Sequence, residues 1–149
     1  MEIKTEISSR YPQPELHVCN RELNDEVKEI VKELHDIYDP KIACTDGRGN
    51  KCMLNPADIV CVYAEGQKVM ALGEKDTYTV SRKLYELEQE LGDRHFVRIS
   101  KSEIVNIRKI QKLDMSIIGT IRIITKNGHE TYVSRRNVSK IKEKFMGLK

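Results

Sequence analysis

Two adjacent arginines near the C-terminus could bind an anion. They lie in VSRRNVSKIKEKF (residues 133–145), where Ser134 or Asn137 is a candidate helix N-cap. If the helix starts at Ser134, Arg135 and Arg136 occupy the first helical turn, where the partial positive charge of the helix end favours acidic residues. A phosphate bound at this end would remove the conflict, because backbone N–H and guanidinium groups could converge on it. Alternatively, both side chains extend into solvent at a cost of about a few tenths of a kcal/mol.

A second group of polar and basic residues lies in RISKSE, where one expected strand gives way to the next. It contains Arg98, Ser100, Lys101 and Ser102. Arginine and lysine reach phosphates or the acceptor edge of guanine, and serine bonds to phosphate or base. A polar turn with a capping serine would produce the same pattern, so the local sequence leaves both interpretations open.

The charge is distributed unevenly along the chain. Residues 96–149 hold 13 basic and 4 acidic side chains, a net charge of +9, whereas residues 1–95 hold 13 and 19, a net charge of −6. Such segregation indicates that the C-terminal third faces a polyanion. A lysine-rich solvated surface is the simpler alternative.

The sequence shows no pattern typical of an enzyme or a metal site. The four histidines are scattered, and GxSxG, HExxH and P-loop motifs are absent. The cysteines form no CxxC pair, so we expect half-buried thiols rather than a zinc site or redox chemistry. We expect no catalysis, cofactor, metal or small-molecule substrate. The cysteines are Cys19, Cys44, Cys52 and Cys61.

The chain has the composition of a globular protein, with 149 residues, 39% hydrophobic and 33% charged. It contains no apolar run of about 18 residues, the length that a membrane span needs. Its first 15 residues hold no apolar segment typical of a signal peptide. We therefore expect a cytoplasmic protein.

Hydrophobic periodicity predicts mostly antiparallel strands with three marginal helices. The helices are expected at residues 22–38, at residues 81–91 with Ser81 as cap and Gly92 as the C′ residue, and from residues 134–137 onward. In the last helix, Val138, Ile141 and Phe145 should face inward. The Asn127-Gly128 pair suits a type I′ hairpin turn. Strands are expected at 2–7, 15–20, 41–46, 50–54, three within 57–81, then 95–100, 103–107, 109–115, 120–125 and 130–134.

Several spaced motifs resemble one family. FVRISKSEIVNIRKIQKL, followed by ITKNGHETYVSRRNVSKIKEKF, is similar to the LytTR-type DNA-binding domain of bacterial transcription regulators. The upstream DIVCVYAEGQKVMAL fits the family's strand pair, and LYELEQELGDRHFVRISKS fits its helix and following strand. The resemblance implies a mainly β, antiparallel LytTR-like fold with a short helix and a C-terminal helix over residues 41–149. A small N-terminal β/α extension, residues 1–40, would serve dimerisation or partner docking.

The resemblance also implies three places where DNA would be contacted. They are the loop near Gln67 and Lys68, the segment 100–102, and the turn 135–137 before the last helix. Serine and lysine stand at positions 100 and 101, where the family often has His-Arg or His-Asn, and lysine favours phosphate over bidentate guanine contact. Asn106 matches the family and is expected to be structural. Arg136 is favoured as the base reader by family match. The expected DNA-binding residues are Gln67, Lys68, Arg98, Ser100, Lys101, Ser102, Arg135, Arg136 and Asn137.

The implied function is a sequence-specific regulator that binds double-stranded DNA as a homodimer on repeated half-sites. About 40 residues precede the domain, too few for a receiver, so control by phosphorylation is not expected. A membrane-protein regulator is a hypothesis by analogy with receiver-less members. One alternative is a protein-interaction module that binds an acidic partner through the basic C-terminal face. An RNA-binding domain is disfavoured, because the chain has two phenylalanines and no tryptophan for base stacking.

Overall fold

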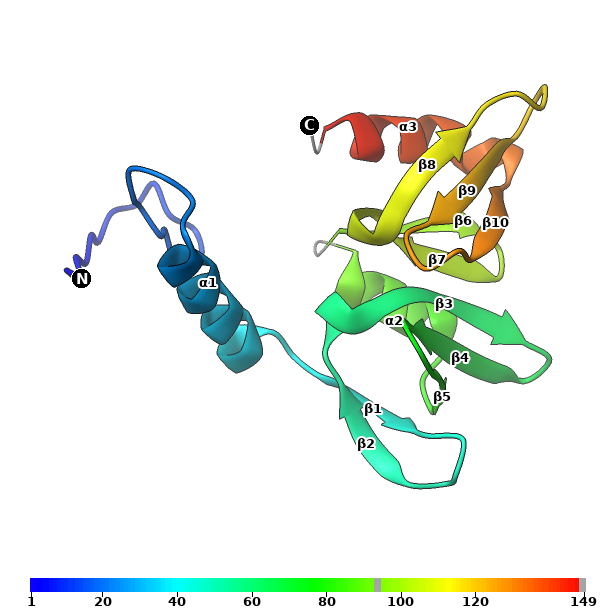
Figure 1. The fold of residues 1–149 in the computed structure, drawn as a ribbon, viewed down its shortest axis with the longest axis horizontal. Helices are drawn as coiled ribbons and strands as arrows, with labels where there is room; N and C mark the ends of the chain where they lie inside the picture. The colour runs from blue at the N-terminus through cyan, green and yellow to red at the C-terminus, as the bar shows by residue number, and fades with distance from the viewer. Residues whose placement is uncertain (93–94, 148–149) are drawn as a thin grey trace. The chain divides into compact units, whose positions relative to one another are not determined.

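The protein is described from a computed structural model that covers residues 1–92 and 95–147. The chain forms two compact units, Met1–Asp39 and Pro40–Lys149 (Figure 1). Among the described residues, no helix combines the length and the apolarity needed to cross a lipid bilayer.

The first unit contains helix α1 (Asp25–Tyr38) after an irregular segment. The Asn24 side chain caps the helix by accepting a 3.0 Å hydrogen bond from the Val27 N–H, and Asp25 and Glu26 suit its positive end. The strands expected at 2–7 and 15–20 were wrong, because neither segment is a strand. A short strand pair is marginal without an apolar face to pack on, and Ile3 and Ile7 are exposed.

The second unit is built on a seven-stranded antiparallel sheet with strand order β2-β1-β5-β4-β3-β7-β6. The β3–β4 hairpin occupies its centre, and β7 pairs with the free side of β3. Helix α2 (Leu84–Leu91) packs on this sheet through leucines. The strands are β1 (Ile42–Thr45), β2 (Lys51–Leu54), β3 (Ile59–Glu65), β4 (Lys68–Gly73), β5 (Thr77–Val80), β6 (Phe96–Ser100) and β7 (Glu103–Asn106), with a 3-10 turn, Pro56–Asp58, before β3.

A smaller sheet and the last helix complete the unit. Its order is β10-β9-β8, from β8 (Ile110–Asp114), β9 (Ile121–Thr125) and β10 (Glu130–Val133). The 3-10 turn Ile107–Lys109 precedes β8, and the 3-10 turn Arg135–Asn137 leads into α3 (Val138–Met146). These elements and labels can be followed in Figure 1.

The large sheet separates two hydrophobic cores. Phe96 and Ile104 enter the core that contains the α2 leucines, whereas their neighbours Val97 and Val105 enter the core shared with the small sheet and with Ile141 of α3. Successive residues of a strand point to opposite faces, so both faces of β6 and β7 are covered. The mainly antiparallel β fold expected from the sequence is confirmed.

Three local expectations were wrong in detail. Asn127 does not have the positive φ that a type I′ turn requires; only Gly128 does (φ 87°). The Gly128 N–H donates to the Thr125 carbonyl at 3.0 Å and the Thr125 N–H to the His129 carbonyl at 2.9 Å, which is a type I turn with a G1 bulge. Helix α2 begins at Leu84, after Lys83 rather than Ser81, and Gly92 is its C-cap in a right-handed conformation.

Candidate nucleic-acid interface

The first expected contact segment is the turn between β3 and β4. Glu65 and Lys68 are paired across the hairpin, and Gly66 (φ 61°) takes the first central position of the two-residue loop, where a type II′ turn needs a positive φ. Gln67 and Lys68 are both exposed. The hairpin therefore presents one amide and one ammonium group at its tip.

The β6–β7 turn lies beside the end of β3. The Ala64 N–H donates to the Ser102 carbonyl at 2.8 Å, and the Ser102 N–H donates to the Ser100 hydroxyl at 3.2 Å. Lys101 is exposed at the tip of this turn. The second expected segment is thus held next to the first.

The 3-10 turn Arg135–Asn137 is attached to the same region through β6. The Ser134 N–H donates to the Ile99 carbonyl at 2.8 Å, directly before Ser100. Asn137 then folds back on Ser134, with its N–H on the Ser134 carbonyl at 2.9 Å and its side-chain amide on the hydroxyl at 2.7 Å. All three expected segments lie on one side of the second unit (Figure 1).

Arg98 differs from the other expected contact residues because its guanidinium group is engaged inside the protein. Nε donates to the Ser100 carbonyl and Nη1 to the Glu88 carboxylate, each at 2.6 Å, and Nη2 donates to the Lys101 carbonyl. Its side chain is 21% exposed. The geometry makes Arg98 the support of the β6–β7 turn.

Arg135 and Arg136 have different surroundings. Arg135 extends over Gly119 (φ 85°), where a Cβ atom would lie 3.6 Å from the Arg135 Nε. Arg136 is exposed and has no hydrogen-bond or ion-pair partner among the described residues. Behind them, α3 is anchored by Ile141, which is fully buried. The helix is the support, and the arginine pair projects from the turn before it.

Asn106 is structural, as expected. It is 3% exposed, its amide donates to the Ile59 carbonyl at 2.9 Å, and its oxygen accepts from the Arg108 N–H at 3.1 Å. These bonds join β7 to β3 and cap the following 3-10 turn.

Arg122 of the basic C-terminal third, like Arg98, is paired with acidic side chains of the protein. Arg122 lies 2.8 Å from the Asp114 carboxylate and 3.6 Å from that of Glu130. Hydrogen bonds from Ser116, together with Arg122, lower the pKa of Asp114 to about 2. By contrast, several exposed basic side chains have no acidic partner within the described part of the chain. These are Lys101, Lys126, Arg135, Arg136, Lys140 and Lys142.

The cysteines are more varied than expected. Cys19 is exposed, Cys52 is half-buried, and Cys44 and Cys61 are buried. Cys44 and Cys52 face each other across the β1–β2 pair with their sulfurs 2.8 Å apart. Burial, followed by the interaction with Cys52, raises the pKa of Cys44 to about 12, which keeps this thiol protonated.

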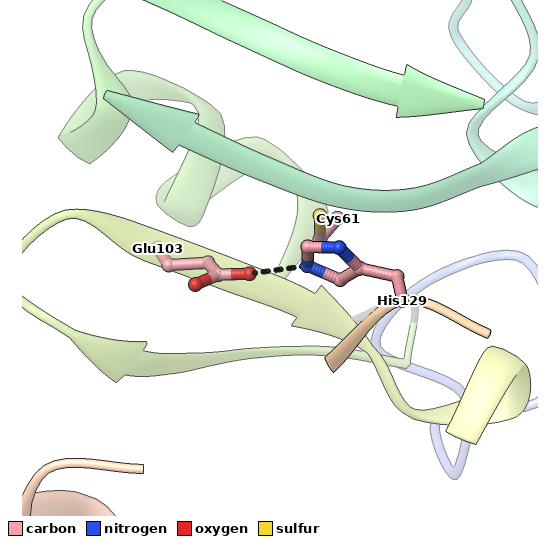
Figure 2. Close-up of side chains that lie close together, drawn as sticks. All are labelled: Cys61, Glu103 and His129. Atoms are coloured by element: carbon pink, nitrogen blue, oxygen red, sulfur yellow. Dashed lines mark hydrogen bonds and ion pairs between the residues drawn. The ribbon is translucent and has the colours of Figure 1, made fainter. Parts of the chain in front are cut away.

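One cluster of metal-ligating side chains has no signal in the sequence. Cys61 of β3, Glu103 of β7 and His129 in the β9–β10 turn place one metal-ligating atom each within 4.8 Å of one another (Figure 2). Their separations in sequence are long, so no local motif signals them. Glu103 of this cluster directly follows Ser102 in the chain.

Comparison with known proteins assigns the chain to a family. An HTH-type transcriptional regulator of Staphylococcus aureus strain MW2 is 32% identical over 147 residues, covering 97% of this chain and 98% of the relative. Another from strain COL is 36% identical over 125 residues, 83% of each chain. The fold matches the LytTr DNA-binding domain of a response regulator from Bacillus cereus, with a TM-score of 0.65 at 22% identity over 70% of this chain and 94% of that domain. The family model for the LytTr DNA-binding domain matches residues 49–146, and the chain belongs to the LytTR family.

Proposed function

We propose that this protein is a bacterial transcriptional regulator that binds double-stranded DNA sequence-specifically through loops. The observation that carries this proposal is the pair of backbone bonds, Ala64 to Ser102 and Ser134 to Ile99, which gather three polar or basic segments on one surface. Each of the three helices is followed by a strand or ends the described chain, so the described residues hold no two consecutive helices joined by a short turn. A helix-turn-helix mode of docking is therefore not favoured.

The exposed residues divide into two roles. Lys101 and Lys68 bind phosphates, because an ammonium group acts as a point charge. Arg136, which is exposed and has no partner among the described residues, reads a base edge, most simply the O6 and N7 of guanine. Arg135, which lies over Gly119, contacts the sugar–phosphate backbone of the DNA. Gln67, Ser100, Ser102 and Asn137 complete the surface, and Arg98 positions the β6–β7 turn.

The protein binds as a homodimer on repeated half-sites, with α1 as the dimerisation element. This helix has no buried residue, although Val27, Ile30, Val31 and Leu34 recur along it at helical spacing. The exposed apolar side chains of Leu23 and Ile37 extend the stripe. A second copy of the helix would cover it.

The proposed setting follows from the ligand. Chromosomal DNA places the protein in the bacterial cytoplasm, and the proposed function needs no cofactor or small-molecule substrate. By analogy within the family, a small membrane protein restrains it. That partner would act on the 1–40 segment, away from the DNA-contacting loops in sequence.

Selection of bound sequences from random DNA, followed by anisotropy titration of the selected site, tests the proposal. Because binding releases counterions, the logarithm of the association constant should fall linearly with the logarithm of salt concentration. The selected site should bind about 10³-fold or more tightly than random DNA. Absence of salt-dependent binding would overturn the proposal. A protein complex that DNA competitor leaves intact would instead support the acidic-partner alternative.

A further inference from the structure

The Cys61, Glu103 and His129 cluster lies between the two sheets of the second unit. Cys61 and Glu103 lie on the same face of the neighbouring strands β3 and β7, since Glu103 pairs with Tyr63, two residues from Cys61. His129 reaches them from the β9–β10 turn of the small sheet. Figure 2 shows the Glu103 carboxylate pointing at the His129 imidazole, with the Cys61 thiol close to the same ring.

The nitrogen–oxygen separation within the cluster fits a tetrahedral metal ion. The His129 Nε2 and the Glu103 Oε1 lie 3.4 Å apart. Nitrogen and oxygen ligands at about 2.0–2.2 Å from zinc lie roughly 3.3–3.6 Å from each other, and a sulfur at about 2.3 Å lies slightly farther away. Every pair of ligand atoms is within 4.8 Å, so a shift of about 1 Å would complete the geometry.

The surroundings hold the ligands in place. The Thr131 hydroxyl donates to Glu103 Oε2 at 2.6 Å, which orients the carboxylate and leaves Oε1 facing His129. Outer hydrogen bonds of this kind are typical of metal-binding carboxylates. The His129 carbonyl is bound by the Thr125 N–H, which fixes the turn that carries the imidazole.

We propose that Cys61, Glu103 and His129 bind one Zn²⁺ ion through thiolate, carboxylate and imidazole, with a fourth position open to water. Glu103 and His129 line a hollow of about 360 Å³ together with Tyr63, Ser102 and Thr131 among others, whereas Cys61 is fully buried. The Glu103 side chain is 14% exposed and that of His129 30%, so an ion can reach them from solvent. On binding, the Cys61 thiol releases its proton to solvent, and thiolate and imidazole ligands favour zinc over magnesium or calcium.

The ion would join the two sheets. It would link β3 and β7 of the large sheet to the β9–β10 turn of the small one, next to the β6–β7 turn that carries Lys101. Since metal binding by the folded chain stabilises that chain, Zn²⁺ should raise its melting temperature. The site does not depend on the proposed DNA contacts, so it can be tested without DNA.

The experiment uses the untagged full chain, purified without chelator and equilibrated with Zn²⁺ or Co²⁺. We expect one ion per chain and a sulfur-to-cobalt charge-transfer band in the Co²⁺ form. His129→Ala should abolish stoichiometric binding, and Cys61→Ser should remove the charge-transfer band. Thr131→Val, which removes only the outer hydrogen bond, should weaken binding about 10–100-fold.

Matched controls come from the first unit, where both residues are exposed. Cys19→Ser and His17→Ala should leave stoichiometry, spectrum and zinc-induced melting shift unchanged. Circular dichroism checks the fold of each variant. If Cys61→Ser unfolds, His129→Ala still tests the site, because His129 is only partly buried and its replacement should leave the fold intact. Failure of the wild-type chain to bind Zn²⁺ would show that the cluster is only hydrogen-bonded. Binding that survives His129→Ala would equally overturn the proposal.

Discussion

The Ser134 N–H donates a 2.8 Å hydrogen bond to the Ile99 carbonyl. This bond attaches the turn that carries Arg135 and Arg136 to the end of β6, one residue before Ser100. Because the Ala64 N–H holds Ser102 in the same way, the three expected contact segments are parts of one supported surface. Changes at its exposed residues and at its supports should therefore affect DNA binding differently.

Arg136→Ala should weaken binding to the selected DNA site by about 1–3 kcal/mol while leaving stability unchanged, because the side chain is exposed and would contact a base. Anisotropy titration on specific and random DNA measures the effect. Arg48→Ala is the control, since Arg48 is an exposed arginine in the β1–β2 turn, at the opposite edge of the large sheet. An equal loss on both DNAs would make Arg136 a phosphate contact.

Arg98→Ala should lower both stability and DNA affinity, because it removes the bonds to Glu88 and to the carbonyls of Ser100 and Lys101. Loss of charge-assisted hydrogen bonds predicts a decrease of about 1–3 kcal/mol in the free energy of unfolding, measured with urea. The salt slope of DNA binding should stay at the wild-type value, whereas Lys101→Ala should reduce it by about 1. A reduced slope for Arg98→Ala would indicate direct phosphate contact.

The proposed α1 dimer predicts that the wild type sediments as a dimer and Leu34→Asp as a monomer, because a carboxylate would enter the apolar stripe of α1. Affinity for DNA with two half-sites should fall, while binding to one half-site should persist. Lys28→Ala changes the net charge equally on the polar side of the helix and should leave the dimer intact. A dimer that tolerates Leu34→Asp would place the interface elsewhere.

The ionised Asp114 carboxylate should make the stability of the fold depend on pH in the acid range. Its pKa is lowered from 3.8 to about 2 in the folded chain, chiefly by hydrogen bonds from Ser116 and also by Arg122. A carboxyl group whose pKa is lowered by folding stabilises the folded state at any pH above its pKa in the unfolded chain. This contribution is lost as the pH falls from about 4 to about 2. Thermal unfolding across that range should show a smaller pH dependence in Asp114→Asn than in the wild type. Identical profiles would contradict the assignment.

Asn106→Ala should destabilise the second unit by about 1–3 kcal/mol, because it leaves the buried Ile59 carbonyl and the Arg108 N–H without their partner. Chemical denaturation measures the loss. Asn20→Ala, an exposed change in the first unit, should stay within about 0.5 kcal/mol of the wild type. A similar result for both variants would show that the buried bonds contribute little.

Much of the local structure follows from short-range patterns in the sequence. The i, i+3 and i+4 spacing of Leu84, Leu87 and Leu91 predicts α2 and its buried face, and Val138, Ile141 and Phe145 do the same for α3. Periodicity fails where a partner is needed. The 2–7 and 15–20 segments have apolar residues, but they form no strand pair. The Asn-Gly pair likewise marks a turn but leaves its type open, because a G1 bulge also places glycine at positive φ.

The sequence by itself determined the positions of most strands and the basic C-terminal third, because these depend on neighbours along the chain. The residues of the expected DNA-contact segments follow from the family resemblance and stay a prediction. Only the tertiary structure decided which of them meet. Strand order brings Ala64 to Ser102 and β6 to Ser134. The fold also places Arg98 where its hydrogen bonds support the β6–β7 turn. It also gathers Cys61, Glu103 and His129. Pairing across a sheet joins residues that are distant in sequence, and short-range periodicity carries no information about that distance.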